Sequence, residues 1–215
     1  MKKLFVLIIA MCISFSFSAN AQAYAKQKAK LEKKEFKARV KKYQKDGWEL
    51  MGSSHTLEMA VVTHYEALAK EGVKEITGYA TSSNKNIGKE KLMLSACATY
   101  AEMIGANVKG RVISDIGSVL STEELSEFEN FYAAFENQVK AEIRGEMRPS
   151  YTVYRAINVN GKPAYEFEEL FIIDEAAASR ARIRAFQNAA KESEIARKYA
   201  EQVSKFIEEA TIEEE

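Results

Sequence analysis

Cysteine, histidine and proline are scarce in this chain, which has two of each among 215 residues. Cys12 lies in an N-terminal segment that we expect to be removed, which leaves only Cys97 and excludes an intramolecular disulfide. The fold must therefore be held by burial alone. Cys97 stands in a run of small and apolar residues, which predicts a buried packing cysteine rather than a reactive thiol.

The few histidines also limit the chemistry. His55 and His64 are nine residues apart and have no cysteine pair beside them, which is not the spacing of zinc ligands. His64 lies on the apolar stripe of a predicted helix, so we expect a core histidine with satisfied hydrogen bonds. No Gly-x-Ser-x-Gly elbow singles out a nucleophilic serine, although a Ser-His-acid triad stays open because its members are distant in a chain.

A polar stretch from Ser83 to Glu90 follows a predicted strand and precedes a helix, as a phosphate-binding loop would. Ser83 stands where such a loop needs its first glycine, and Glu90 stands where it needs a hydroxyl. A carboxylate there repels a phosphate, and no closely spaced glycine triplet supports a dinucleotide site. We therefore predict an ordinary strand-to-helix connection, and no catalytic, cofactor-binding or metal-binding residues are assigned. Gly78 of the strand and the small residues Ala96, Cys97 and Ala101 of the helix are expected to let the two pack closely.

Long apolar runs are absent except at the N-terminus. Lys2 and Lys3 precede an apolar run over residues 4–17, and Ala19-Asn20-Ala21 forms a small-x-small cleavage site. This pattern predicts a secretory signal peptide over residues 1–21, because the run is shorter than the roughly 20 residues of a membrane-spanning helix. Met11 precedes Cys12, whereas lipoprotein processing needs a small residue there, so lipidation at Cys12 is disfavoured.

Charge is balanced overall, with 31 basic and 31 acidic residues, but it is unevenly distributed. The segment 22–46 holds ten basic residues against three acidic ones, while the last eight residues hold five glutamates and no cation. Good helix formers and a thin apolar stripe predict that the basic segment is a helix. Such a helix attracts anionic polymers, lipid head groups or nucleic acid, the alternative being a solvated helix offset by the acidic tail.

Apolar spacing and turn residues predict the remaining elements. We expect a capping box at Ser121 with Glu124, a tight hairpin at Asn160-Gly161 and a helix start at Asp174. The predicted strands cover residues 48–51, 74–82, 108–120, 139–147, 151–159 and 164–173, and the predicted helices cover 56–72, 88–104, 121–136 and the chain from 174 onward, which has no proline to interrupt it.

Strands that alternate apolar and polar residues favour an antiparallel sheet. The sequence therefore predicts an α+β fold, an antiparallel sheet with helices packed on one face and helical extensions at both ends. We expect a signal peptide (1–21), a basic helical extension (22–46), an α+β core domain (47–173) and a C-terminal helix with an acidic tail (174–215).

The strand with Gly78, the alanine-rich helix from Lys91 to Ala106, the strand from Val108 and the later strand at Tyr151 to Tyr154 resemble the core of the twenty-kilodalton envelope lipoprotein family. The resemblance covers residues 74–174. It implies an exported α+β module of bacterial envelopes with no established catalytic residues to carry over. The chain departs from the family in lacking a convincing lipid-attachment cysteine.

Together these features predict an exported envelope protein, periplasmic, associated with the outer membrane or secreted, that acts as a non-enzymatic binding or structural module. Its expected partner is an envelope protein or an anionic polymer, bound through the basic helix 26–45, and an oligomer is compatible with the helical extensions. Export argues against nucleic acid, and no membrane-spanning segment is expected in the mature chain. The alternative is a periplasmic hydrolase or small-ligand carrier with a site between sheet and helices.

Overall fold

The structure is a computed structural model, and it describes residues 34–52 and 55–210. The chain divides into two compact units, Met1–Asp46 and Gly47–Glu215. In the first unit, residues 34–45 are helical, as predicted for the basic segment. The predicted signal peptide, residues 22–33 and the last five residues lie outside the described part of the chain.

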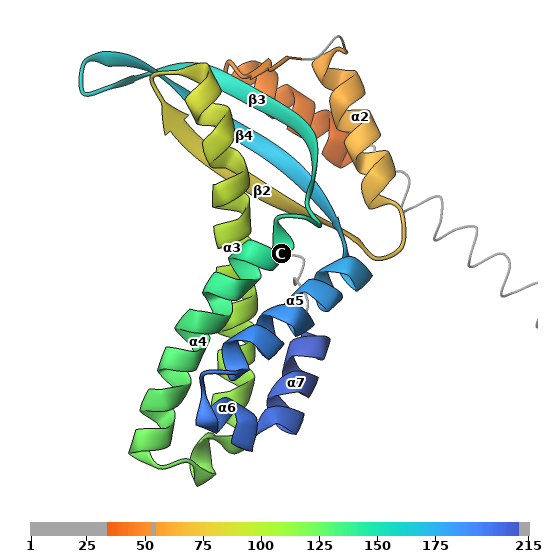
Figure 1. Cartoon of the computed structure of the whole chain (residues 1–215). Coiled ribbons are helices and arrows are strands. Elements are labelled where there is room, and N and C mark those ends of the chain that lie inside the picture. The colour runs from red at the N-terminus through yellow and green to blue at the C-terminus, as the bar shows by residue number, and fades with distance from the viewer. Residues whose placement is uncertain (1–33, 53–54, 211–215) are drawn as a thin grey trace, which may run out of the picture. The chain divides into compact units, whose positions relative to one another are not determined.

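The second unit combines an antiparallel sheet with a layer of helices, which confirms the predicted α+β class (Figure 1). The sheet has the strand order β1-β3-β4-β2, and every neighbouring pair is antiparallel. In chain order the elements are β1 (Glu49–Leu50), α2 (Leu57–Leu68), β2 (Val73–Ser82), α3 (Lys85–Ile116), the 3₁₀ turn η1 (Gly117–Val119), α4 (Thr122–Ile143), β3 (Arg148–Val159), β4 (Lys162–Asp174), α5 (Glu175–Ala190), α6 (Glu194–Lys198) and α7 (Ala200–Glu209).

The predicted hairpin joins β3 to β4. Val159 pairs with Lys162, and the two residues between them, Asn160 and Gly161, have φ values of 53° and 79°. Positive φ at both central residues is the conformation of the two-residue turn that matches the twist of antiparallel strands. The hairpin prediction is therefore confirmed.

Helix α3 packs on the sheet through glycine. A Cβ atom placed on Gly78 of β2 would lie 2.3 Å from the carbonyl oxygen of Leu92, and one placed on Gly88 would lie 2.2 Å from the ring of Phe167 on β4. Real Cβ atoms do not approach other atoms so closely, so only glycine allows this packing. This confirms that Gly78 and the small residues of the helix serve close packing.

Helix α2 lies on the opposite face of the sheet from α3. Its His64 contacts Glu75 on β2 and Ser150 on β3, whereas the neighbouring Ile76 joins the core on the α3 side. Because successive side chains of a strand point to opposite faces, Glu75 and Ile76 mark the two sides. Helices therefore lie on both faces of the sheet, the long helix α3 on one and α2 on the other, whereas the sequence predicts helices on one face.

The predicted strand over residues 108–120 is wrong, because α3 continues unbroken through Gly105 to Ile116. The buried residues Val108, Val112 and Ile116 are four apart, a spacing that fits a helix face as well as one side of a strand. Gly105 does not end the helix but lets α4 approach, since a Cβ there would lie 2.4 Å from a carboxylate oxygen of Glu136.

The predicted strand over residues 139–147 is also wrong, because α4 extends to Ile143. Val139, Ile143 and Met147 are buried, whereas Ala141 and Gly145 between them are exposed. The apparent period of two came from small residues that happen to be apolar. The buried set follows the helical period of four.

The C-terminal segment begins at Asp174 as predicted, since its side chain accepts a hydrogen bond from the amide of Ala177. It is not one continuous helix, however, but three, α5, α6 and α7. The Ser193 hydroxyl caps the start of α6 by accepting a hydrogen bond from the amide of Ala196. The carboxylate of Glu127, on α4, accepts a hydrogen bond from the amide of Ile195. These two side chains satisfy a helix start in the middle of the segment, which allows the chain to fold back onto α3 and α4.

Candidate functional site

The stretch that resembles a phosphate loop begins α3. Its first helical amides are already satisfied, because the side chain of Asn84 accepts hydrogen bonds from Asn86 and Ile87. The ammonium group of Lys85 lies over the rings of Tyr154 and Tyr165, at 3.8 and 4.8 Å from their centroids. The residues of the stretch thus cap the helix and fasten it to the sheet by a cation–π contact.

The structure brings a serine, a histidine and a carboxylate together between α2 and the sheet. Nδ1 of His64 lies 2.9 Å from the hydroxyl oxygen of Ser150, and Nε2 contacts a carboxylate oxygen of Glu75. The His64 side chain is 0% exposed, while that of Glu75 is 25% exposed and Ser150 is partly exposed. We call these three residues the Ser-His-Glu cluster.

A bulge in β3 positions the serine. Pro149 pairs with Phe171 and Tyr151 pairs with the preceding residue, Leu170, so Ser150 is the extra residue on its strand. A bulge redirects side chains, and bulges are frequent next to active sites. The ring of Tyr151 then packs edge-on against His64, with the centroids 5.4 Å apart.

His64 lies in the core with both ring nitrogens in polar contact, as the sequence predicts. The sequence leaves a triad open but does not identify its members. Glu75 is 11 residues and Ser150 is 86 residues from His64, and no local motif marks either of them. Proline before the serine was the nearest signal, since it disturbs the strand at that point.

A second carboxylate is buried on the α3 side of the sheet. Glu169 of β4 accepts a hydrogen bond from the hydroxyl of Thr152, at 2.7 Å. Burial raises the pKa of Glu169, and the hydrogen bond from Thr152 and the charge of Lys89 oppose that rise. This carboxyl group therefore takes up a proton more readily than an ordinary glutamate does.

The helices α3, α5 and α7 share one buried guanidinium group. Arg182 donates to the hydroxyl of Tyr100, to the carboxylate of Glu175 and to the backbone carbonyl of Ile207, at 2.6, 2.7 and 3.2 Å. Burial raises the pKa of Tyr100 to about 12, so its hydroxyl stays neutral. The geometry is that of a structural junction, because the Arg182 guanidinium of α5 contacts groups of α3 and α7 as well as Glu175 of its own helix.

Cys97 is buried in the core, as predicted. Burial raises the pKa of its thiol, and its sulfur lies 4.0 Å from that of Met147. A thiol with a raised pKa is a poor nucleophile, so Cys97 acts as a packing residue. His55, the other histidine, is exposed just before α2.

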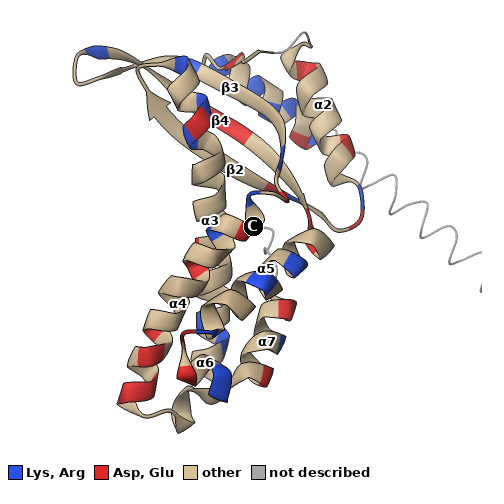
Figure 2. Cartoon of the chain, viewed as in Figure 1, with Lys and Arg blue, Asp and Glu red and all other residues tan. Residues whose placement is uncertain are grey.

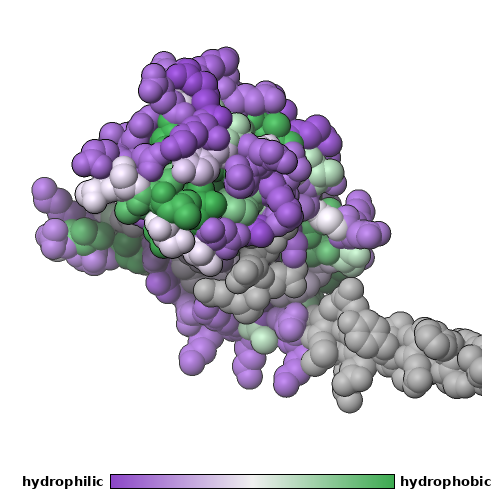
Figure 3. All heavy atoms as spheres, turned by 90° about the horizontal axis from the view of Figure 1, so that it is seen from below, coloured by the Kyte–Doolittle hydropathy of each residue, from purple (hydrophilic) through white to green (hydrophobic). Residues whose placement is uncertain are grey.

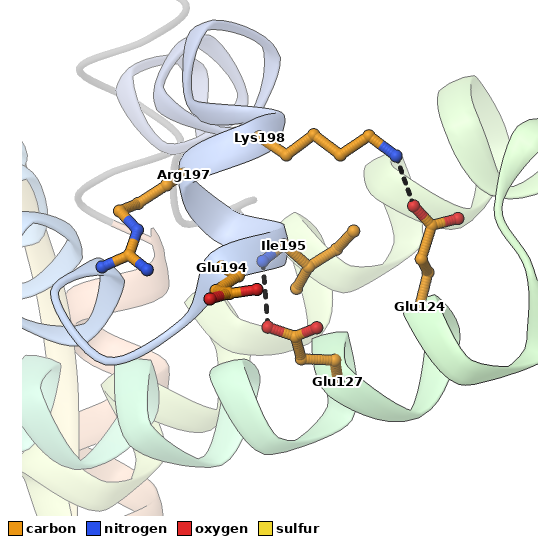
Figure 4. Close-up of a pocket in the computed structure, with 6 residues that line it drawn as sticks. All are labelled: Glu124, Glu127, Glu194, Ile195, Arg197 and Lys198. Atoms are coloured by element: carbon orange, nitrogen blue, oxygen red, sulfur yellow. Dashed lines mark hydrogen bonds and ion pairs between the residues drawn. The ribbon is translucent and has the colours of Figure 1, made fainter.

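A shallow depression of about 520 Å³ lies between α4 and α6 (Figure 4). Lys198 reaches across it to Glu124, at 2.5 Å, and Glu127 accepts the amide of Ile195. The hydrogen bond between Lys198 and Glu124 raises the pKa of the lysine and lowers that of the glutamate. The polar side chains that line the depression thus join α4 and α6.

The surface carries uneven charge and one cluster of exposed apolar residues. Acidic residues are frequent in α4, which has six glutamates against one lysine (Figure 2). Around the turn between α3 and α4, Ile113, Val119 and Leu125 are 52%, 69% and 38% exposed. A space-filling view from below shows apolar surface gathered on that side of the molecule (Figure 3).

Within residues 34–52 and 55–210, no three histidine, cysteine, aspartate or glutamate side chains gather as metal ligands would. No helix of this described part has the length and apolar character needed to cross a bilayer.

Compared with known proteins, the chain matches no family model, no curated protein and no solved structure, so the resemblance to the twenty-kilodalton envelope lipoproteins stays a prediction.

Proposed function

We propose that the protein is an exported component of a bacterial envelope and that it acts by binding a partner rather than by catalysis. The signal-peptide pattern of residues 1–21 supports export. The basic segment 26–45 supports binding, and its partner is an anionic polymer or an acidic protein of the envelope.

One observation carries this proposal. The helix over residues 34–45 exposes five lysines, at positions 34, 37, 41, 42 and 45, while the only acidic residue within it is Glu35. A surface with an excess of one sign of charge concentrates polymers of the opposite sign and speeds their association. The helix is therefore suited to a partner that carries many negative charges.

Binding to heparin, a sulfated polymer, tests the proposal. In the test variant Lys34, Lys37, Lys41, Lys42 and Lys45 become glutamine. The control variant changes five other exposed lysines to glutamine, namely Lys70, Lys91, Lys162, Lys191 and Lys205. Both variants lose the same formal charge. We expect only the test variant to elute at much lower salt, because its charges lie on one helix.

An equal loss of retention in the two variants contradicts the proposal, since overall charge would then account for binding. Cross-linking in intact cells, followed by mass spectrometry, identifies the natural partner and reports any oligomer. Cell fractionation tests export separately. We expect the cleaved chain in the periplasm, in the outer membrane or in the medium, and an uncleaved chain confined to the cytoplasm contradicts that expectation.

The Ser-His-Glu cluster favours a second candidate function, a periplasmic hydrolase with its site between sheet and helices. A serine, a base and an orienting carboxylate in hydrogen-bond contact form the arrangement that activates a nucleophile.

A further inference from the structure

We propose that the Ser-His-Glu cluster is an acyl-transfer site in which Ser150 attacks small carboxylic esters. The inference rests on the second candidate function and is independent of the basic helix. It starts from the contact of Nδ1 of His64 with the Ser150 hydroxyl, at 2.9 Å, and of Nε2 with Glu75. The first distance is within the 2.6–3.2 Å range of a nucleophile and its base.

The acceptor groups assign the proton on the histidine. The Glu75 carboxylate accepts only, so Nε2 of His64 carries the hydrogen that it donates to Glu75. Nδ1 then has a free electron pair and accepts the hydroxyl proton of Ser150. Compared with the familiar serine triad, the two ring nitrogens exchange partners, but each partner keeps its role.

Packing holds the base in this orientation. The rings of Tyr65 and Tyr151 meet the imidazole edge-on, with centroid distances of 6.0 and 5.4 Å. His64 is 0% exposed, so the interaction of Nε2 with Glu75 is poorly screened by water. Ser150 is partly exposed on its bulge, which lets a substrate reach the oxygen while the base stays dry.

The reaction proceeds in two balanced steps. The Ser150 oxygen bonds to the ester carbonyl carbon while its proton passes to Nδ1 of His64. The alcohol then leaves with that proton, and an acyl-serine remains. Water attacks the acyl group and gives a proton to Nδ1, and the serine oxygen departs with it as the carboxylic acid is released. Glu75 stabilises the imidazolium that forms in each step.

The position of Ser150 selects the class of substrate. The serine is partly exposed on its strand bulge and does not line the depression between α4 and α6. A nucleophile outside such a depression places few walls around a substrate, which favours short acyl groups with a good leaving group. We therefore expect aryl and alkyl esters of short acids to be used, and peptides to be poor substrates.

Labelling with a fluorophosphonate probe tests the inference on the chain from residue 22 onward. The serine of an activated cluster displaces fluoride from the probe, and mass spectrometry locates the adduct. We expect one adduct, at Ser150, and its complete loss in Ser150→Ala. Ser126→Ala, which removes an exposed serine of α4, is the matched control and keeps full labelling. Hydrolysis of p-nitrophenyl acetate should follow the same pattern.

Glu75 acts as a positioning residue, so its test needs a readout beyond stability. We expect Glu75→Ala to lower the labelling rate about 100-fold, because His64 acts as the base less effectively without the carboxylate that orients it. Glu75→Asp should restore part of the rate and retain a low-field proton resonance from Nε2 of His64. Circular dichroism and urea unfolding of each variant report whether the fold is kept.

The outcomes distinguish failure of the acyl-transfer site at Ser150 from failure of the hydrolase function as a whole. No adduct on the folded wild-type chain overturns both the acyl-transfer site and the hydrolase. An adduct on a different serine overturns the role of Ser150 but keeps a hydrolase. Full labelling in Glu75→Ala overturns the cluster as a triad. None of these results bears on heparin binding by the basic helix.

Discussion

The sheet layer and the helical layer of residues 47–215 both bury aromatic rings, but they differ in the charged groups that they enclose. By sheet layer we mean the four strands with α2 and the first half of α3, and by helical layer the rest of α3 with α4 to α7. Under the helices lie packed aromatic rings, among them Phe128, Phe131 and Phe135, and one guanidinium group, that of Arg182. Under the strands lie two carboxylate contacts, made by Glu75 and Glu169.

The charged groups of the helical layer contribute to stability, whereas those of the sheet layer include the groups proposed for catalysis. Arg182 joins three helices, and its partners all belong to the interior or its margin. The Ser-His-Glu cluster opens to the surface at two of its three members. A fully buried polar contact specifies how elements pack. A partly exposed polar cluster that includes a nucleophile has the groups that a reactive site needs. Substitutions in the two layers should therefore differ in kind.

The largest effect is expected in the helical layer, for Arg182→Ala. The change leaves the buried hydroxyl of Tyr100 and the half-buried carboxylate of Glu175 without their partner. Breaking a buried pair in this way costs about 3–5 kcal/mol of unfolding free energy. Urea unfolding measures it. The exposed Arg180 supplies the control, since Arg180→Ala should change stability by less than about 0.5 kcal/mol. Similar losses of unfolding free energy in both variants would show that Arg182 does not hold the three helices together.

In the sheet layer, Gly78→Ala should have the next largest effect. Its new Cβ would meet the backbone oxygen of Leu92 at 2.3 Å, and a backbone atom cannot rotate away. We expect a loss of about 2–3 kcal/mol, near the upper end for overpacking. Gly110→Ala, in α3, is the matched change, with nothing within 4 Å of its Cβ. It should instead gain about 0.5–1 kcal/mol through helix propensity. Unfolding midpoints of the two variants that move in the same direction would sink this account of Gly78.

A smaller effect is expected at the start of α4, where Ser121 and Glu124 satisfy each other's amides. Ser121→Ala should cost about 1 kcal/mol, the usual loss of a helix cap. Ser126→Ala, inside the same helix, should leave stability nearly unchanged or raise it slightly. Thermal unfolding distinguishes the two, and an unchanged melting temperature in Ser121→Ala would show that the cap contributes nothing.

The smallest effect, and one of opposite sign, is expected for Glu169→Gln. Because burial raises the pKa of Glu169, the folded state binds its proton more tightly than the unfolded state does. The stability that this proton provides is present below the usual value of 4.5 and is lost as pH rises through the raised value. Glutamine keeps a hydrogen-bonding group without the charge, so the variant should be more stable than the wild type at pH 7.

That advantage should shrink as the pH falls toward 4.5, where the wild-type carboxyl group becomes protonated. Urea midpoints of both proteins between pH 4 and pH 8 check the trend. A wild type that is more stable than Glu169→Gln at pH 7 would mean that the charged carboxylate is better satisfied than its burial indicates.

The comparison of layers also shows where sequence reasoning succeeds. Turns and caps were predicted correctly because their signals are local. Asn160 and Gly161 adopt positive φ at a low cost in free energy. The side chains of Asp174 and Ser121 accept hydrogen bonds from amides three residues further along, which does not depend on the rest of the chain. The strands β2, β3 and β4 were predicted because their residues alternate and are rich in β-branched and aromatic types.

The same reasoning failed over residues 108–120 and 139–147, both in the helical layer. Val108, Val112 and Ile116 occupy every fourth position, which is an even spacing and satisfies a strand and a helix alike. Only contact with α4 and α7 decides between them, because burial on one side of a helix stabilises α3 past Gly105. The three-part C-terminus depends in the same way on Glu127 of a different helix.

By itself the sequence determined the α+β class, the hairpin, the starts of α2, α4 and α5 and the packing role of Gly78, because each depends on neighbours in the chain or on a residue's own conformational limits. It also contains the pattern that predicts export. Tertiary structure alone decided the length of α3 and α4, the placement of α2 and the meeting of Ser150, His64 and Glu75. The physical reason is distance along the chain: residues separated by 86 positions meet only when a sheet, a bulge and a packed helix have formed around them.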